Sequence, residues 1–208
     1  MPDNNFGIQL DQKNEFVARK IQTNLTPPML YEEVIRRNEA LIAENGPLVF
    51  FTGKCTGRSP NDKFFVRESS SQEKIWWGKT NKPLEEEKFE NLKARVLDYF
   101  SHKDAFIQNC FGGADPQNRY PVRIITDTAW ESLFAFNMLR HADSASLKDF
   151  SPEFTILVAS NFESEPDLDG TQSDVVVAIN LEQRLALIAG TRYAGEIKKT
   201  VLDRKSVV

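Results

Sequence analysis

The sequence predicts an α/β fold, a mixed β-sheet with flanking helices. Short segments rich in β-branched and aromatic residues recur along the chain, as is typical of strands. Longer segments between them repeat apolar residues at the helical period of roughly 3.6. The 208 residues suffice for one large domain or two small ones. Because no convincing interdomain linker separates the segments, we expect residues 1–208 to form a single domain.

The first expected helix follows Thr26-Pro27-Pro28, because proline is tolerated in the first turn of a helix. Leu30, Val34 and Leu41 fall on one stripe at helical spacing, which should face the core. The pattern stops at Asn45-Gly46, a common signal for the end of a helix. We therefore expect one helix from this proline pair to Asn45.

Two further helices are expected in the middle of the chain. Apolar residues from Phe89 to Tyr99 recur at helical spacing among charged residues, which predicts a helix over about 85–100. Another helix is expected over about 128–140. Asp127 or Thr128 can cap its N-terminus, since either side chain can accept a hydrogen bond from a free backbone N–H.

The strands lie between and after these helices. Leu48 to Phe51 is expected to be a buried strand. The last two strands are separated by Asn180–Arg184, which predicts a hairpin. Glu163–Ser173 is acidic and rich in turn residues, so we expect an exposed loop there. The other expected strands are Phe64–Arg67, Ala105–Cys110, Val122–Ile125, Phe154–Ala159, Val175–Ile179 and Leu185–Ala189.

Composition and charge exclude several classes of function. The net charge of −4 and the pI of about 5.4 imply no general attraction to nucleic acid or to an anionic membrane. The beginning of the chain contains neither a basic start followed by an apolar core nor a run near the ~20 residues of a membrane span. Cys55 and Cys110 lack metal-ligand spacing and form no disulfide framework, which favours a reducing compartment. We expect a cytoplasmic protein with no nucleic-acid or membrane partner.

A loop rich in glycine and cations follows the Leu48–Phe51 segment. Residues 52–63 read TGKCTGRSPNDK, and Gly53 and Gly57 permit backbone turns that few other residues tolerate. Lys54 and Arg58 are thereby expected to converge on one anion, with the planar guanidinium of Arg58 at its centre. The spacing does not fit the phosphate loop of a nucleotide-binding site. From composition alone, a hairpin loop with solvated charges is an equal alternative.

Several motifs, taken together, resemble the ATP-dependent phosphoenolpyruvate carboxykinases. The resemblance covers roughly residues 28–199, and the motifs follow one another in the order that this family presents. They are TGKCTGRSPNDKF from residue 52, IWWGKTNKP at 75–83, GGADPQNRYPVRIIT at 112–126, AWESLFAFNM at 129–138, DFSPEFTIL at 149–157 and GTRYAGEIKK at 190–199.

The resemblance implies an enzyme of gluconeogenesis that converts oxaloacetate and ATP to phosphoenolpyruvate, carbon dioxide and ADP. On the matching positions, it implies that Arg58 holds the substrate carboxylate and that Tyr193 lines the pocket for the substrate or carbon dioxide. Lys199 is implied as a substrate contact and as a neutral-amine ligand of Mn²⁺. Lys198 is implied to face the transferred phosphoryl group. Arg58, Tyr193, Lys198 and Lys199 are thus the expected catalytic residues.

The chain departs from the family after Lys199. The family continues into a larger carboxy-terminal nucleotide-binding domain, whereas residues 199–208 read as an atypical tail. We expect this chain to be the substrate-side, amino-terminal domain of a carboxykinase and to be inactive alone. Mn²⁺ and Mg-ATP are expected in the complete enzyme, but neither should bind tightly to this chain, which has no cofactor-binding residues of its own. The alternative is a free-standing, non-catalytic domain that binds an oxyacid or regulates another protein.

The remaining aromatic and histidine candidates are interpreted as structural. Trp76 and Trp77 lack an interleaved basic stripe, so packing or a surface contact is favoured over base stacking. His102 and His141 are isolated from other metal-ligating residues, which favours a solvated or capping role.

Overall fold

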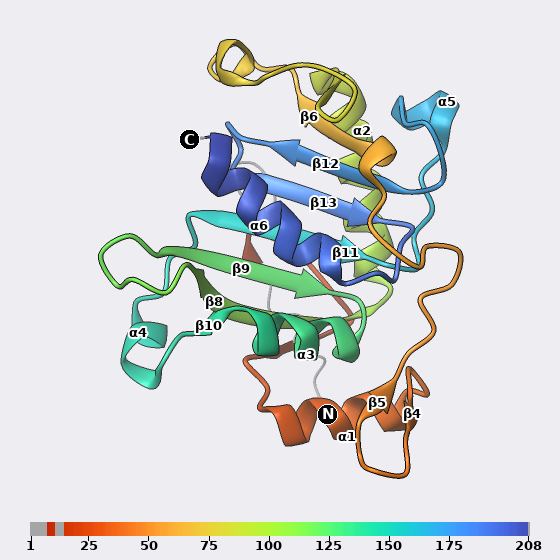
Figure 1. The fold of residues 1–208 in the computed structure, drawn as a ribbon, viewed down its shortest axis with the longest axis vertical. Coiled ribbons are helices and arrows are strands. Elements are labelled where there is room, and N and C mark those ends of the chain that lie inside the picture. Colours follow the sequence, from red (N-terminus) through yellow and green to blue (C-terminus); the bar gives the residue numbers. More distant parts are fainter. Residues whose placement is uncertain (1–7, 11–14, 208) are drawn as a thin grey trace.

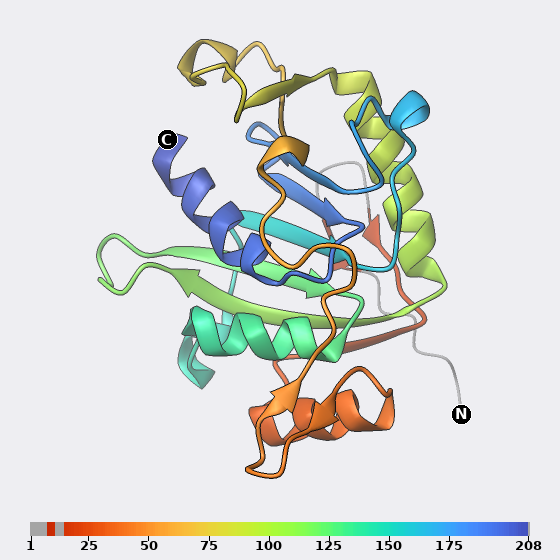
Figure 2. The same ribbon diagram turned by 45° about the vertical axis from the view of Figure 1, so that its right-hand side comes forward.

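The computed structural model describes residues 8–10 and 15–207, with side chains as far as Arg204. Within these residues the dominant feature is a nine-stranded mixed β-sheet (Figures 1 and 2). Its strands are β3 (Lys20–Thr23), β6 (Lys63–Val66), β7 (Lys82–Leu84), β8 (Asp104–Gly112), β9 (Tyr120–Thr126), β10 (Arg140–His141), β11 (Phe154–Ala159), β12 (Val176–Asn180) and β13 (Leu185–Ala189). The α/β fold with a mixed sheet and flanking helices is therefore confirmed.

The strand order is β10-β8-β9-β11-β13-β12-β6-β7, with β3 paired to β8 beside β10. The central strands β9, β11 and β13 run parallel to one another, and β12 pairs antiparallel with β13. β6 is parallel to β12. The β12–β13 pair is the hairpin expected around Asn180–Arg184. Two small ribbons complete the strands, β1 (Ile8–Gln9) with β2 (Glu15–Phe16) and β4 (Leu41–Ile42) with β5 (Leu48–Val49).

Helices cover both faces of the sheet, as expected when strands alternate apolar side chains to both sides. On one face, α2 (Glu86–Ser101) packs on residues that include Ile125 and Leu157. On the other face, α3 (Ala129–Met138) and α6 (Gly195–Val207) pack on residues that include Ile124 and Ile156 (Figure 1). Consecutive residues of one strand, such as Ile124 and Ile125, therefore pack into hydrophobic cores on opposite faces of the sheet. The other helices are α1 (Pro27–Arg36), α4 (Ser144–Lys148), α5 (Pro166–Asp169) and the short 3₁₀ turns Pro60–Asp62 and Gln72–Lys74.

The first helix is shorter than the sequence predicts. α1 ends at Arg36, and Asn38 then adopts a left-handed backbone with φ 54°. Leu41 and Ile42 form β4 instead, and their side chains are exposed. The Asn45-Gly46 pair does not end a helix but turns the β4–β5 ribbon, with Gly46 at φ 95°. The same apolar spacing that suits a helix stripe is satisfied here by a short hairpin.

Two other expectations are wrong. Leu48 to Phe51 is not a buried strand, because β5 has only two residues and the Phe51 side chain is 67% exposed. The segment 163–173 is not simply an exposed loop. It contains α5, and Asp169 is fully buried where it pairs with Arg95. Ionic pairing allows this carboxylate to be buried, and composition did not reveal that pairing.

The aromatic and histidine side chains follow the structural interpretation. Trp77 is partly buried on the α6 side of the sheet and donates to the Gln72 carbonyl at 2.9 Å, whereas Trp76 is 90% exposed. His102 ends α2, and His141 stacks on Phe136. Across residues 8–10 and 15–207, no helix is both long and apolar enough to cross a membrane.

Candidate substrate site

The sheet topology places two distant motifs at one edge. β6 is parallel to β12, and β12 is antiparallel to β13, so the start of β6 and the end of β13 lie at the same edge of the sheet. The glycine-rich loop, residues 52–62, leads into β6, and residues 190–194 follow β13 and lead into α6. The two motifs that are most basic in the sequence therefore meet in space.

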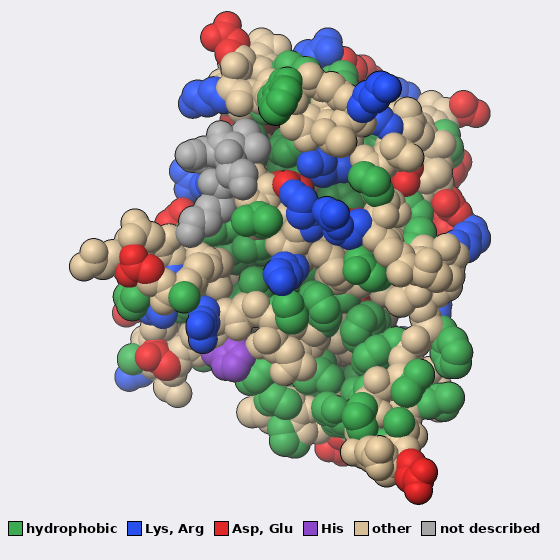
Figure 3. Space-filling view, viewed as in Figure 1, with side chains coloured by type: hydrophobic (Ala, Val, Ile, Leu, Met, Phe, Trp, Pro, Cys, Tyr) green, Lys and Arg blue, Asp and Glu red, His purple; other side chains and the backbone are tan. Residues whose placement is uncertain are grey.

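A pocket of about 450 Å³ lies where these segments meet. Arg58, Tyr193, Lys198 and Lys199 all line it, so the structure brings together the four residues that are expected to be catalytic. The rest of its lining is largely apolar and comes from Thr52, Trp130, Phe134, Met138, Ala194, Gly195 and Leu202. On the face seen in Figure 3, Lys and Arg side chains gather near the middle, beside an extended apolar area.

Glu196 ties the two motifs together. The side chain is buried at the start of α6, and its Oε1 accepts a hydrogen bond from the backbone N–H of Ser59 at 2.7 Å. Burial raises the pKa of Glu196, while this bond and the nearby charge of Arg58 oppose the rise. Glu196 lies inside the GTRYAGEIKK motif but is not among the site residues that the sequence predicts. Its position three residues before Lys199 was the available signal, since residues three apart share a helix face.

The position of the Tyr193 ring depends on Gly195, the glycine that begins α6. A Cβ atom on Gly195 would lie 2.4 Å from the Cε1 of Tyr193, a separation that real Cβ contacts do not show. Glycine at this position therefore leaves room for the aromatic ring beside the first turn of the helix. The backbone N–H of Tyr193 donates to Thr191 Oγ1 at 3.1 Å, a local hydrogen bond that forms a turn over residues 191–193.

The two lysines are consecutive residues of α6. Consecutive residues of a helix point about 100° apart, so the two side chains diverge. Lys198 is exposed, whereas Lys199 is partly buried and donates a hydrogen bond to Asp203 one turn later. Asp203 is also 3.4 Å from Lys63 Nζ, and its side chain is only 10% exposed. This buried acid, which pairs with Lys199 and Lys63, is not among the site residues that the sequence predicts.

Lys54 does not join Arg58 as the sequence suggested. Its ammonium pairs with Asp174 at 2.6 Å and with Glu163 at 3.5 Å, and it does not line the pocket. The expected convergence of Lys54 and Arg58 on one anion is therefore absent from this structure.

A manganese site is not complete among these residues. The Lys199 amino group donates to the Asp203 carboxylate, so in this structure it is engaged in an ion pair within α6. Within the part of the chain that the structure describes, no group of three or more His, Cys, Asp and Glu is arranged to hold a metal. Lys199 on its own does not meet the need for several converging ligands.

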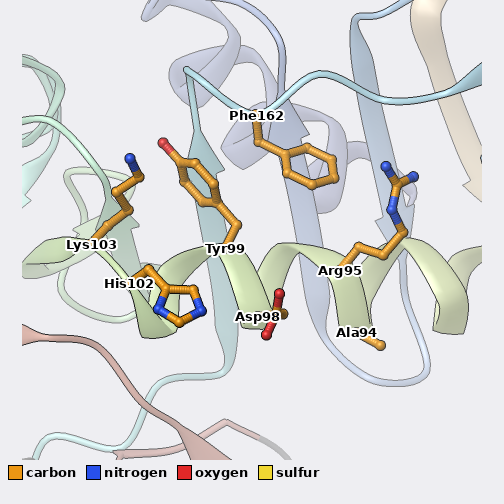
Figure 4. Close-up of a pocket in the computed structure, with 7 residues that line it drawn as sticks. All are labelled: Ala94, Arg95, Asp98, Tyr99, His102, Lys103 and Phe162. Carbon is orange, nitrogen blue, oxygen red and sulfur yellow. The ribbon is translucent and has the colours of Figure 1, made fainter.

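A larger groove of about 660 Å³ lies elsewhere, along α2 (Figure 4). It is lined by Ala94, Arg95, Asp98, Tyr99, His102, Lys103 and Phe162, and by none of the predicted site residues. Size alone therefore does not locate the candidate site. The convergence of two basic motifs does.

Comparison with known proteins gives a consistent result. The sequence matches the family described as phosphoenolpyruvate carboxykinase over residues 19–207. It is 47% identical over 178 residues to phosphoenolpyruvate carboxykinase (ATP) of Geotalea uraniireducens, covering 85% of this chain and 34% of the relative. The corresponding protein of Thermus thermophilus is 43% identical over 187 residues, covering 88% and 35%.

The chain thus spans about a third of the length of the curated relatives it matches. The family match also includes residues 199–207, so the expectation of an atypical tail over 199–208 is wrong for most of that segment. Since that match covers far more than half of the residues and includes both basic motifs, the chain belongs to the ATP-dependent phosphoenolpyruvate carboxykinase family.

Proposed function

We propose that this chain is the substrate-side part of a phosphoenolpyruvate carboxykinase and that its basic pocket binds oxaloacetate or phosphoenolpyruvate. The observation that carries the proposal is the meeting of Arg58, Lys198 and Lys199, from two distant motifs, around one pocket. Both ligands carry two anionic groups on a small carbon skeleton. A guanidinium and two ammonium groups offer complementary charges, and the apolar wall shields them from water.

In the proposed reaction, oxaloacetate and ATP give phosphoenolpyruvate, carbon dioxide and ADP. The bond between the leaving carboxylate and the adjacent carbon breaks, and its electron pair forms the enolate of pyruvate. The enolate oxygen then bonds to the γ-phosphorus of ATP, and ADP leaves. Negative charge builds on the enolate and moves with the phosphoryl group, so fixed cations lower the energy of both steps.

Each pocket residue has a proposed role in this chemistry. Arg58 holds the carboxylate that remains on the substrate, through two parallel hydrogen bonds. Tyr193 lines the space for the substrate or for carbon dioxide. Lys198 faces the transferred phosphoryl group. Lys199 contacts the substrate and, in a complete enzyme, would supply one ligand to Mn²⁺, with Mg-ATP and the remaining metal ligands coming from outside the described residues.

A second candidate function is a free-standing domain that binds an oxyacid without catalysis. The location of all three pocket cations within this one chain supports that candidate. The two candidates share the same pocket and the same ligand class. They differ in whether ATP is consumed.

Titration calorimetry with phosphoenolpyruvate tests the shared part of the proposal. The chain should bind the ligand, and Arg58→Lys should weaken binding about tenfold or more, because an ammonium cannot reproduce the bidentate grip of a guanidinium. Arg36→Lys is the matched control, since Arg36 lies on α1 and pairs with Glu33 away from the pocket. Equal affinities of the wild type and Arg58→Lys would remove Arg58 from the site, and equal losses in both variants would indicate an effect that is not specific to Arg58.

A further inference from the structure

Three loops with polar side chains follow three adjacent parallel strands. Asp127 follows β9, Asn161 follows β11, and Arg192 follows β13, which are neighbours in the order β9-β11-β13 (Figure 1). The carboxyl ends of parallel strands lie at the same edge of a sheet, where ligands of α/β proteins commonly bind. The three side chains are therefore placed next to one another by the sheet itself.

Of these three side chains, Asp127 is the most firmly held. It is 4% exposed, and its carboxylate accepts hydrogen bonds from the Tyr99 hydroxyl at 2.7 Å and from the Ser160 backbone N–H at 3.1 Å. Figure 4 shows Tyr99 rising from α2 with its hydroxyl directed away from the helix. A buried carboxylate held from a helix and a strand end has little freedom to move.

Asn161 connects Asp127 to Arg192. Its backbone N–H and its side-chain Nδ2 each donate to Asp127 Oδ2 at 3.2 Å. The amide orientation is thereby set, and Oδ1 accepts two hydrogen bonds from Arg192, at 2.6 Å from Nη2 and 3.2 Å from Nε. Only a side chain with both a donor and an acceptor can join a carboxylate to a guanidinium in this way.

The link matters because residues 191–193 make few other hydrogen bonds to the rest of the protein. The Tyr193 carbonyl also accepts from the Glu196 N–H at 3.1 Å, in the first turn of α6, so among the described residues the bonds from Arg192 to Asn161 are the hydrogen bonds that join 191–193 to a segment distant in the sequence. Gly190 donates to the Ala159 carbonyl at a long 3.4 Å, and the bond between Tyr193 and Thr191 is local. Arg192 immediately precedes Tyr193, so this link acts on the backbone that carries the ring.

We infer that Asn161, oriented by Asp127, is a positioning residue that holds the loop 190–194 and so fixes Tyr193 in the substrate pocket. Asn161 does not line the pocket itself. Its expected effect on ligand affinity rests on the proposed function, whereas its expected effect on the loop does not.

Hydrogen–deuterium exchange of the full chain tests the effect on the loop. In Asn161→Ala and in Arg192→Ala, the amides of 192–194 should exchange at least threefold faster than in the wild type, while the amides of β11 and β13 keep their rates. The double variant should exchange no faster than either single variant, because both remove the same link. Asn91→Ala is the matched control, an exposed asparagine on α2, and should leave the loop unchanged.

Phosphoenolpyruvate calorimetry on the same variants separates positioning from a purely structural role. Asn161→Ala should bind the ligand at least threefold more weakly, with a thermal midpoint close to that of the wild type. Unchanged exchange at 192–194, faster exchange spread through β11 and β13, or faster loop exchange with unchanged affinity would each overturn the inference. If the wild type does not bind phosphoenolpyruvate but the loop responds as expected, the loop attachment stands and the proposed function fails.

Discussion

At the scale of single residues, the pocket owes its charge balance to acids as much as to cations. Asp203 accepts from Lys199 and lies near Lys63, and Glu196 receives the Ser59 N–H. Both acids are largely buried, Asp203 in ion pairs with two lysines and Glu196 with a backbone hydrogen bond and the charge of Arg58 nearby, which limits the cost of burying them. The two adjacent lysines are therefore not equivalent, since only Lys199 has a buried partner.

We expect this difference to appear in stability. Lys199→Met leaves the buried Asp203 with only the more distant Lys63 and should lower the free energy of unfolding by about 1–2 kcal/mol. Lys198→Met removes an exposed charge and should change it by less than about 0.5 kcal/mol. Urea unfolding at neutral pH measures both. A larger loss for Lys198→Met would show that the assigned partners are wrong.

A second residue-scale prediction concerns Glu131. It is 1% exposed, and its Oε2 accepts hydrogen bonds from the hydroxyls of Thr128 and Ser160. Burial, with the charge of Asp127 adding to it, raises the pKa of Glu131 from 4.5 to about 8. The folded protein therefore holds a proton that the unfolded chain releases, and this contribution to stability is lost as pH rises from about 4.5 through about 8.

Glu131→Gln should remove this pH dependence, because glutamine resembles the protonated acid in shape and carries no charge. The wild type should lose stability relative to the variant as the pH of urea unfolding rises from 5 to about 9. Glu73→Gln, at an exposed glutamate, is the control. Parallel pH profiles for the wild type and Glu131→Gln would mean that Glu131 is ionised in the folded protein.

At the scale of secondary-structure elements, the start of α6 controls the shape of the pocket. Gly195→Ala puts a Cβ atom against the Tyr193 ring, so the ring must move. We expect phosphoenolpyruvate affinity to fall at least threefold with little loss of stability, since alanine favours the helix. Gly78→Ala, where a Cβ meets nothing within 4 Å, is the control. Calorimetry and thermal melts measure the effects, and wild-type affinity in Gly195→Ala would mean that the ring position is unimportant.

At the scale of the whole molecule, the proposed function assigns to this chain the substrate side of the reaction. It spans about a third of the length of its relatives, and its sequence contains no glycine-rich phosphate loop of the nucleotide-binding type. We expect no specific affinity for ATP and no carboxykinase turnover from these residues alone. Calorimetry with ATP checks the first point and a coupled assay the second. Micromolar ATP binding that ADP displaces would contradict the prediction.

The sequence determined the α/β class, helices α2 and α3 and six strands of the main sheet, and its motifs contain four residues that line one pocket. Those features depend on local periodicity or on motifs that are contiguous in the chain, as in GTRYAGEIKK. The sequence did not determine where α1 ends, because Leu41 and Ile42 have spacing that suits a helix and are placed by pairing with β5.

Tertiary structure alone decided which charges meet. Lys54 and Arg58 are four residues apart in one loop, yet Lys54 turns to Asp174 and Arg58 to the pocket. Glu196 and Asp203 acquire their roles from partners far away in sequence, Ser59 and Lys63. Asp127, Asn161 and Arg192 meet only because β9, β11 and β13 are parallel neighbours. Contacts of this kind depend on strand order, which no local pattern of residues encodes.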